Sequence, residues 1–263
     1  MYLKRKADAY LNAWKSDPNR SPLIIKGPRQ VGKTETIDYF AAHNYRSVVE
    51  INFVEEPKYR AITADGYGAN TIVRNISLID PAKKFIPGDT LIFFDEIQAH
   101  PDIATALKFF KIDGKYDVIC SGSMLGISYK QIESNSVGYK TDYEMRSLDF
   151  EEFLWARGYD EAVIESMFTH LCDATPFSEV EMNVFSTAFM DYCVLGGMPA
   201  VVASHIRTGT FEGTLQLQRQ LILDYQEDIR KYAQGLDQAR ILNVFNHIPV
   251  QLAKENKKFQ DRK

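Results

Sequence analysis

The sequence predicts an α/β protein whose first half holds a mainly parallel, helix-covered sheet and whose second half is helical. Three observations support this prediction. Short apolar runs alternate with helical stretches over residues 1–149, an order that favours parallel strands covered by helices. A glycine-rich turn joins the first apolar run to a helix, and only helical patterns follow residue 150.

The elements of the first half follow from the spacing of apolar residues. A helix is predicted over residues 3–15, where apolar side chains recur at helical spacing. Strand-like apolar runs follow it, separated mostly by helical or mixed stretches. These runs cover residues 22–25, 47–53, 90–95, 116–121 and about 139–148.

The second half contains helical patterns without a convincing strand between them. Helices are predicted over residues 150–154, 161–171, 179–195, 215–232 and 241–253. A sharp turn is expected at Gly196-Gly197-Met198-Pro199. We therefore place a domain boundary near Asp149, with an α/β domain over residues 1–149 and a helical region over residues 150–263.

Composition and charge exclude some classes of protein. The 263 residues are 45% hydrophobic and 25% charged, which is typical of soluble globular proteins. The net charge of −4 gives no overall basic field for nucleic acid, so DNA is a weakly supported partner. Only Lys4-Arg5-Lys6 and a C-terminal group offer local positive charge, and a solvated face is the favoured interpretation of both groups. The C-terminal group consists of Lys254, Lys257, Lys258, Arg262 and Lys263.

The cysteines and the start of the chain bear on the compartment. Cys120, Cys172 and Cys193 are far apart and odd in number, which favours a reducing compartment, and we expect them to be buried small residues. No run of 18 apolar residues is present, and the chain starts with the charged segment MYLKRKADAY. We therefore expect a cytoplasmic protein that does not engage a membrane.

The segment GPRQVGKT, from Gly27 to Thr34, fits the phosphate-loop pattern G-x-x-x-x-G-K-[ST] at every fixed position. Backbone N–H groups of such a loop surround phosphate oxygens, Lys33 brings a cation to the β and γ phosphates, and the Thr34 hydroxyl can bind Mg²⁺. An apolar run precedes the loop and a predicted helix follows it, which directs the helix N-terminus at the phosphates. The alternative, a mere glycine-containing turn, is disfavoured by this context. The expected nucleotide contacts are Gly27, Pro28, Arg29, Gln30, Val31, Gly32, Lys33, Thr34 and Glu35.

Two adjacent acids end the apolar run at residues 90–95. A buried strand of this kind delivers them to the carboxyl edge of the sheet, where ligands of open α/β sheets bind. Asp95 is expected to hold Mg²⁺ together with Thr34, and Glu96 to polarise the water that attacks the γ phosphate. Two solvated acids ending an ordinary strand are the alternative.

Two further residues are candidate contacts of the phosphates, and the role of Arg29 within the loop has two interpretations. Ser121 and Ser123 lie at the end of the next strand, where either can sense the γ phosphate, although Ser123 can equally cap a following helix. Arg29 can either touch phosphate or pair with a neighbouring acid. The residues leave both choices open.

The motifs GPRQVGKT, FFDEIQ, SGSMLG, LDFEEFL and GGMP, in this order, resemble the AAA-type P-loop ATPases of bacteria and archaea that carry a C-terminal nuclease-like domain of unknown function. The resemblance spans nearly the whole chain. It implies a five-stranded sheet in the order 5-1-4-3-2, covered by helices, then a helical lid that leads into a winged-helix-like element. The chain ends before the nuclease-like domain, so we expect an N-terminal ATPase fragment or a shortened member.

The same resemblance implies roles for individual residues. Lys33 and Thr34 would be nucleotide and Mg²⁺ ligands, Asp95 a Mg²⁺ ligand, and Glu96 the catalytic acid-base, with Lys33 as the second catalytic residue. Related ATPases often place Asn or Thr where this chain has serine at the sensor strand, which leaves the sensor role open.

These observations predict a Mg-ATP-dependent ATPase that acts as a nucleotide-driven switch or remodelling module and turns over slowly without a partner. The alternative is a non-hydrolysing ATP-binding scaffold for a protein or DNA partner. A homo-oligomer and an unknown protein partner are further expectations. A GTPase is disfavoured because no base-reading Asn-Lys-x-Asp motif stands at a usable position.

Overall fold

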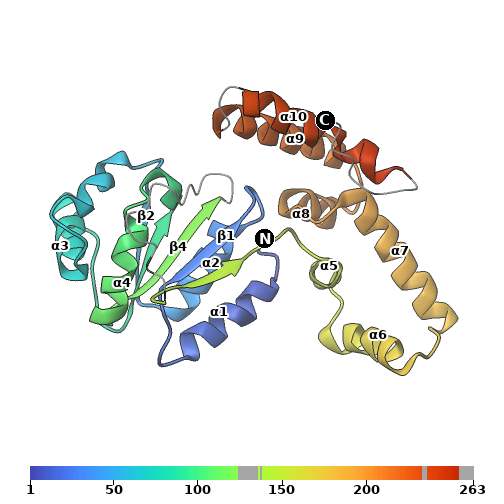
Figure 1. Cartoon of the computed structure of the whole chain (residues 1–263). Helices are drawn as coiled ribbons and strands as arrows, with labels where there is room; N and C mark the ends of the chain where they lie inside the picture. Colours follow the sequence, from blue (N-terminus) through green and yellow to red (C-terminus); the bar gives the residue numbers. More distant parts are fainter. Residues whose placement is uncertain (124–135, 137, 233–235, 255–263) are drawn as a thin grey trace. The chain divides into compact units, whose positions relative to one another are not determined.

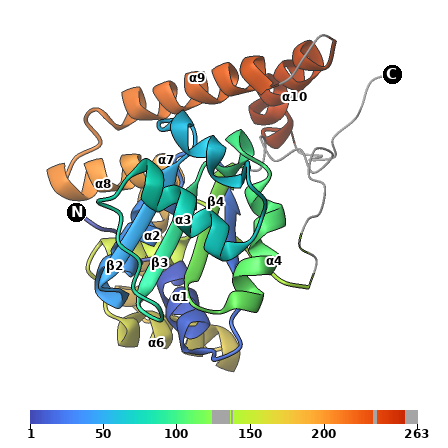
Figure 2. The same cartoon turned by 90° about the vertical axis from the view of Figure 1, so that its left-hand side faces the viewer.

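The computed structural model describes residues 1–123, 136, 138–232 and 236–254, and the chain forms two compact units, residues 1–210 and 211–263. A five-stranded parallel sheet in the order β2-β3-β4-β1-β5 lies at the centre of the first unit. Figure 2 shows β2, β3 and β4 side by side in this order. The expected sheet order is thereby confirmed.

Each predicted apolar run forms one of the strands. Central β3 is buried at every position because helices cover both of its faces, which explains its unbroken run of apolar residues. Strand β5 is shorter than the predicted run and ends at Glu144. The strands are β1 Leu23–Gly27, β2 Ser47–Asn52, β3 Thr90–Asp95, β4 Asp117–Ser123 and β5 Thr141–Glu144.

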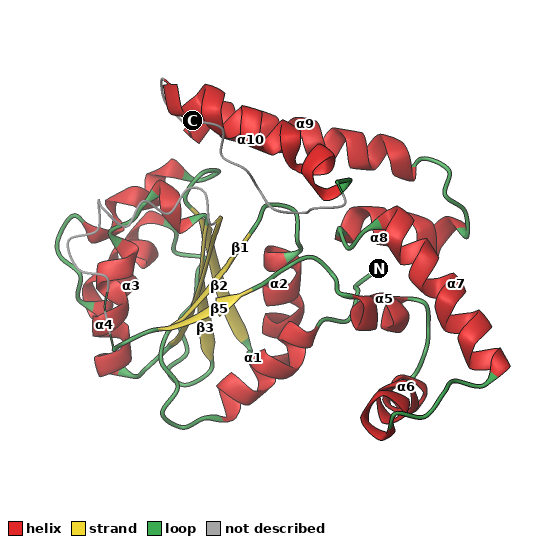
Figure 3. Cartoon of the chain, turned by 45° about the vertical axis from the view of Figure 1, so that its right-hand side comes forward, coloured by secondary structure: helices red, strands yellow, loops and turns green. Residues whose placement is uncertain are grey.

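Helices cover the two faces of the sheet, as Figures 1 and 3 show. Successive side chains of a strand point to opposite faces. Ile25 therefore packs with α1 and α2, whereas Ile24 packs with α3 and α4. The helices of this part are α1 Lys6–Ser16, α2 Lys33–Asn44, α3 Ala69–Ile79 and α4 Ile103–Asp113, with short 3-10 turns η1 Pro57–Thr63 and η2 Ile97–Ala99.

Helix α1 begins at Lys6 rather than at Leu3, where the apolar spacing places its start. The cause is the extended backbone of Arg5, with φ of −125° and ψ of 150°. Asp8 accepts a hydrogen bond from the Arg5 backbone N–H at 2.8 Å and so caps the helix. The side chain of Arg5 is thereby free to leave the helix and enter the protein interior.

Four helices follow the sheet within the first unit. Two of them start at capping boxes, formed by Asp149 with Glu152 and by Ser178 with Glu181. The apolar spacing predicted three of the four but missed α8, which starts directly after the Gly-Gly turn with Pro199 at its first position. They are α5 Phe150–Ala156, α6 Glu161–Asp173, α7 Glu179–Leu195 and α8 Pro199–Thr208.

The second unit, in its described residues, consists of α9 Thr214–Tyr232 and α10 Leu236–Leu252. Gln226 donates a hydrogen bond to Asn246 at 2.9 Å, and Gln238 donates to the carbonyl oxygen of Arg230 at 2.8 Å. Later residues of α10 therefore meet earlier residues of α9, so the two helices run antiparallel. The winged-helix-like element and the domain boundary near Asp149 stay predictions. Over the described residues, none of the helices has the length and apolar character needed to cross a membrane.

The cysteines only partly follow expectation. Cys120 on β4 is buried, but Cys172 and Cys193 are exposed. The expectation fails there because α6 and α7 bury few side chains, and both cysteines lie on their outward faces. All three are free thiols.

Two glycines allow backbone segments to approach closely. A Cβ atom added at Gly27 would lie 2.1 Å from the carbonyl oxygen of Met145, and one added at Gly197 would lie 2.0 Å from that of Leu148. Gly197 O also accepts a hydrogen bond from Leu148 N at 2.7 Å. The second glycine of the GGMP motif therefore ties the turn before α8 to the segment that leads into α5.

Gly197→Ala is expected to lower the free energy of unfolding by about 1–3 kcal/mol, because two backbone segments must move apart. Gly68→Ala is the matched control, since its added Cβ would meet only the Thr71 hydroxyl at an ordinary 3.5 Å. Urea denaturation of both variants checks this. Equal stabilities would contradict the packing argument.

Candidate functional site

The glycine-rich loop turns sharply between β1 and α2. Gln30 and Gly32 have positive φ angles of 62° and 89°, in the left-handed region that glycine enters at little cost. Gly32 is the residue from which α2 starts, so the helix begins at Lys33. The N-terminal N–H groups of α2 therefore lie at the end of the loop, an arrangement suited to anions.

The side chain of Lys33 is buried and folds back over the loop. Its Nζ donates hydrogen bonds to the carbonyl oxygens of Gly27 at 3.0 Å and Pro28 at 2.7 Å. Burial lowers the pKa of Lys33, while the nearby carboxylates of Glu96 and Asp95 act in the opposite direction. The site therefore holds a desolvated cation next to two acids.

The carboxylate of Asp95 collects donors from three other elements. It accepts hydrogen bonds from the Thr34 hydroxyl at 3.3 Å, from Asn52 Nδ2 at 3.2 Å and from the Ser121 hydroxyl. The backbone N–H of Glu96 donates to it at 2.9 Å. The ends of β2, β3 and β4 thus meet the start of α2 around one buried acid.

Glu96 stands one residue past β3 in an unusual conformation. Its φ of 54° lies in the left-handed region, where a non-glycine residue costs about 1–3 kcal/mol. The side chain is half-buried and accepts a hydrogen bond from Gln98 Nε2. Such a conformation persists only where surrounding contacts maintain it, and the hydrogen bond from Gln98 is one of these contacts.

The two candidate serines differ in their partners. Ser121 donates to Asp95, so its hydroxyl already holds the acid. Ser123 is buried opposite Gly27 in the sheet register, and its hydroxyl has no hydrogen-bond partner among the described residues. The alternative role of Ser123 as a helix cap concerns residues 124–135, which lie outside the described part of the chain.

The remaining predicted contacts surround the loop in different ways. Val31 is buried in the core, and Arg29 is half-buried. Pro28, Gln30 and Glu35 are exposed at the loop surface. Position in the motif alone therefore does not tell which side chains face solvent.

Two further carboxylates, those of Asp38 and Glu50, interact electrostatically with Asp95. Burial raises the pKa of Asp38, and the charges of Asp95 and Glu35 add to this effect. Burial likewise raises the pKa of Glu50, helped by Asp38 and Asp95. Mutual repulsion of carboxylates is the condition that a divalent cation relieves.

The oxygen groups at this edge fit Mg²⁺, which prefers one or two carboxylates and keeps several waters. Asp95 and Thr34 supply a carboxylate and a hydroxyl within 3.3 Å of each other. In the part of the chain that the structure describes, no three His, Cys, Asp or Glu side chains form a metal cluster. A sparse, phosphate-assisted Mg²⁺ site suits these residues better than an all-protein metal cage.

Sequence reasoning missed three side chains of this region. Asn52 touches Asp95 and Gln98 touches Glu96, while Arg5 donates to the carbonyl of Val31 inside the loop. Asn52 carried a usable signal, because it ends a strand whose carboxyl end meets that of β3. Gln98 was noted only as part of a motif, and Arg5 offered no local pattern.

The basic group at residues 4–6 is not an open cationic face. Arg5 is buried and pairs with Glu152 at 3.1 Å, which corrects the expectation of a solvated side chain. Lys4 pairs with Glu161, and Lys6 pairs with acids at the start of α5. The sequence could not indicate these ion pairs, because all of the acids lie more than a hundred residues away in sequence and are brought near only by the tertiary structure.

The sheet order, the loop between β1 and α2, and the acid at the end of β3 are those of the P-loop NTPases of AAA type. A model of the family described as AAA domain matches residues 19–154, and one described as a domain of unknown function matches residues 186–262. The chain therefore belongs to the AAA domain family of ATP-binding proteins.

Solved structures also resemble the chain. Domain III of the replication initiation protein DnaA from Thermotoga maritima is 15% identical, with a TM-score of 0.45, over 93% of this chain and 94% of that one. PCH-2 of C. elegans is 11% identical, with a TM-score of 0.37, over 66% of this chain. The match spans 48% of the PCH-2 chain, about half its length. No curated protein matches the sequence.

Asp95→Asn is expected to lower the free energy of unfolding by about 2 kcal/mol, because an amide keeps one acceptor oxygen and turns an N–H₂ group toward existing donors. Glu35→Gln is the control, since Glu35 is an exposed acid at the same edge. Urea denaturation in the presence of a chelator measures both without any contribution from metal. An Asp95→Asn protein as stable as the control would show that these hydrogen bonds do not support the fold.

Proposed function

We propose that this chain is an ATPase that binds Mg-ATP, hydrolyses it to ADP and phosphate, and acts as a nucleotide-driven switch or remodelling module. One observation carries the proposal. The Thr34 hydroxyl at the start of α2 lies 3.3 Å from the Asp95 carboxylate at the end of β3, which brings the phosphate loop and the acidic strand to one edge. Membership of the AAA family supports the same function.

Binding of the nucleotide falls to the loop and the start of α2. Backbone N–H groups over residues 27–34 surround phosphate oxygens, and the buried ammonium of Lys33 turns from loop carbonyls to the phosphates. Thr34 and Asp95 would hold Mg²⁺, which spreads the phosphate charge when it is bound. The buried cation is suited to this because little of its charge is screened by water.

Hydrolysis requires a base, and Glu96 is the group that fits. Its carboxylate takes a proton from a water whose oxygen attacks the γ phosphorus, while the bond from that phosphorus to the bridging oxygen of ADP breaks. Gln98 holds the carboxylate of Glu96 in one orientation. The buried hydroxyl of Ser123 is a donor for an oxygen of the γ phosphate.

The output of the cycle would be a movement that follows loss of the γ phosphate and its contacts. We propose that turnover is slow until a protein partner binds, and that copies of the chain associate in a homo-oligomer. Residues 1–149 act as the ATPase domain and residues 150–263 as the helical lid region. A cytoplasmic location is part of the same proposal.

Lys33→Ala is expected to weaken ATP binding by about 100-fold, because the buried cation is lost. Glu96→Gln should bind ATP like the wild type yet lower kcat by about 100- to 10,000-fold, because the general base is lost. Calorimetric titration and phosphate release measure the two effects.

Undiminished hydrolysis by Glu96→Gln would reject its role as base. Tight binding of ATP by the wild type, without phosphate release beyond that of Glu96→Gln, would instead favour a non-hydrolysing scaffold. Lys26→Gln is the control for Lys33→Ala, because it removes a lysine of β1 that pairs with Asp142 outside the loop.

Ser123→Ala and Ser121→Ala should have opposite signatures. Ser123→Ala removes a hydroxyl without a described partner, so stability should change by no more than about 0.5 kcal/mol while kcat falls about tenfold or more. Ser121→Ala removes a donor to Asp95, and stability should fall by about 1 kcal/mol. Thermal denaturation and phosphate release distinguish them. Normal turnover by Ser123→Ala would transfer the sensor role to Ser121.

A further inference from the structure

A buried arginine lies behind the phosphate loop and contacts three separate segments. Arg5 donates through Nη1 to the carbonyl oxygen of Val31 at 2.7 Å and through Nη2 to that of Arg146 at 2.6 Å. Its Nε donates to Glu152 at 3.1 Å. Arg5 and Glu152 are each 5% exposed. The guanidinium therefore joins the loop, the segment after β5 and helix α5.

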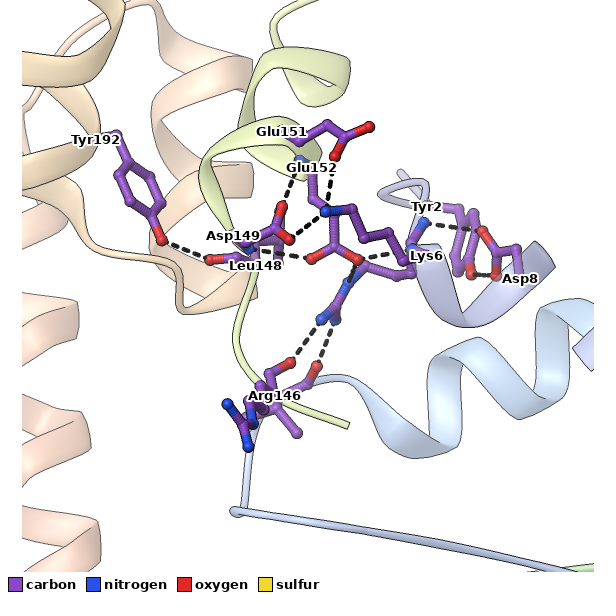
Figure 4. Close-up of polar contacts among 11 residues, drawn as sticks. Tyr2, Lys6, Asp8, Arg146, Leu148, Asp149, Glu151, Glu152 and Tyr192 are labelled. Atoms are coloured by element: carbon purple, nitrogen blue, oxygen red, sulfur yellow. Dashed lines mark hydrogen bonds and ion pairs between the residues drawn. The ribbon is translucent and has the colours of Figure 1, made fainter. Parts of the chain in front are cut away.

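Glu152 is itself fixed by the surrounding backbone. It accepts hydrogen bonds from the backbone N–H groups of Lys6 at 2.7 Å and Asp149 at 3.1 Å (Figure 4). A buried charge pair is maintained only where such additional hydrogen bonds satisfy it. Arg5 is therefore held in one position by groups that do not belong to the phosphate loop.

The contact with Val31 has a consequence for the next residue. Because a trans peptide is planar, the carbonyl of Val31 and the N–H of Gly32 point in opposite directions. Because the carbonyl of Val31 points toward Arg5, the N–H of Gly32 points away from Arg5. A cationic donor on the carbonyl also polarises the peptide and makes that N–H a stronger donor.

Glycine at this position leaves the peptide with little restraint of its own. Gly32 has a φ of 89°, and the nearest groups to a Cβ built there are Arg5 Nη1 at 3.6 Å and Pro199 at 3.7 Å. Arg5 and the first residue of α8 thus cover the back of the loop. The orientation of the Val31–Gly32 peptide therefore depends on the contacts that Arg5 and Pro199 make with the loop.

We propose that Arg5 is a positioning residue for the phosphate loop: paired with Glu152, it fixes the Val31–Gly32 peptide so that the Gly32 N–H is presented to nucleotide phosphates. The inference rests on the proposed function, because it takes the loop to bind phosphate. It assigns the N-terminal segment and α5 a role in nucleotide affinity, although neither would touch the nucleotide through these side chains.

The test measures binding of Mg-ADP, which avoids turnover, by calorimetric titration well below the melting temperature. Arg5→Gln is expected to raise Kd about tenfold or more with the stoichiometry unchanged, because charge-assisted hydrogen bonds to the loop are lost. Arg5→Lys should fall between Arg5→Gln and the wild type, because one ammonium cannot span two carbonyls and a carboxylate. If Arg5 only stabilised the fold, its substitution would lower the number of nucleotide molecules bound per chain and leave Kd unchanged.

Lys6→Gln is the matched control. Lys6 is the next residue and pairs with Asp149 and Glu151 at the start of α5 (Figure 4). Unlike that of Arg5, its side chain is 46% exposed. The Kd of the Lys6→Gln variant for Mg-ADP should equal that of the wild type. Glu152→Gln should raise Kd less than Arg5→Gln, and the double variant should be no worse than Arg5→Gln, because both residues act through one contact.

If Arg5→Gln and Arg5→Lys both bind Mg-ADP with the Kd of the wild type, the proposal is wrong. If Arg5→Gln does not fold, the Kd of Arg5→Lys is the deciding measurement. Amide hydrogen exchange over residues 27–34 gives a readout without nucleotide, and Arg5→Lys should exchange faster than Lys6→Gln. If the wild type binds no nucleotide while this difference persists, the proposed function fails and the positioning role stands. Equal exchange in the two variants would overturn the positioning role.

Discussion

The buried carboxylate of Asp95 is the point on which the arrangement of the site depends. Donors from the start of α2 and from the ends of β2 and β4 converge on it. Parallel strands bring their carboxyl ends to one edge, and a buried acid at the centre of that edge is costly unless hydrogen bonds replace its contacts with water. The same hydrogen bonds therefore stabilise the acid and align the elements that would hold a nucleotide.

The conformation of the phosphate loop beside this acid depends on contacts with other segments of the chain. Gly27 lies against the carbonyl of Met145, Arg5 holds the carbonyl of Val31, and Pro199 covers Gly32. These contacts come from the segment after β5, the start of the chain and α8. A loop of peptides with little side-chain packing gains a defined shape only from such neighbours, so helices beyond the sheet take part in shaping the phosphate loop.

Two residues hold backbone strain at the same edge. Gln30 and Glu96 have positive φ angles without being glycine, one within the loop and one directly after Asp95. The hydrogen bond from Gln98 to Glu96 helps to maintain the second of them. Strain of this kind persists where surrounding contacts outweigh its cost, and it favours a fixed carboxylate over a freely rotating one.

The sequence by itself determined the alternation of strands and helices, the phosphate-loop motif and the acids after β3, because these features depend on local spacing and on short-range turn chemistry. It could not determine that Arg5 is buried or that Ser121, rather than Ser123, binds Asp95. Helix α8 was likewise missed. Arg5 finds Glu152 at a separation of 147 residues, and no periodic pattern encodes such a pair. Only tertiary structure decided these contacts, because the free energy of a buried polar group depends on which distant partners surround it.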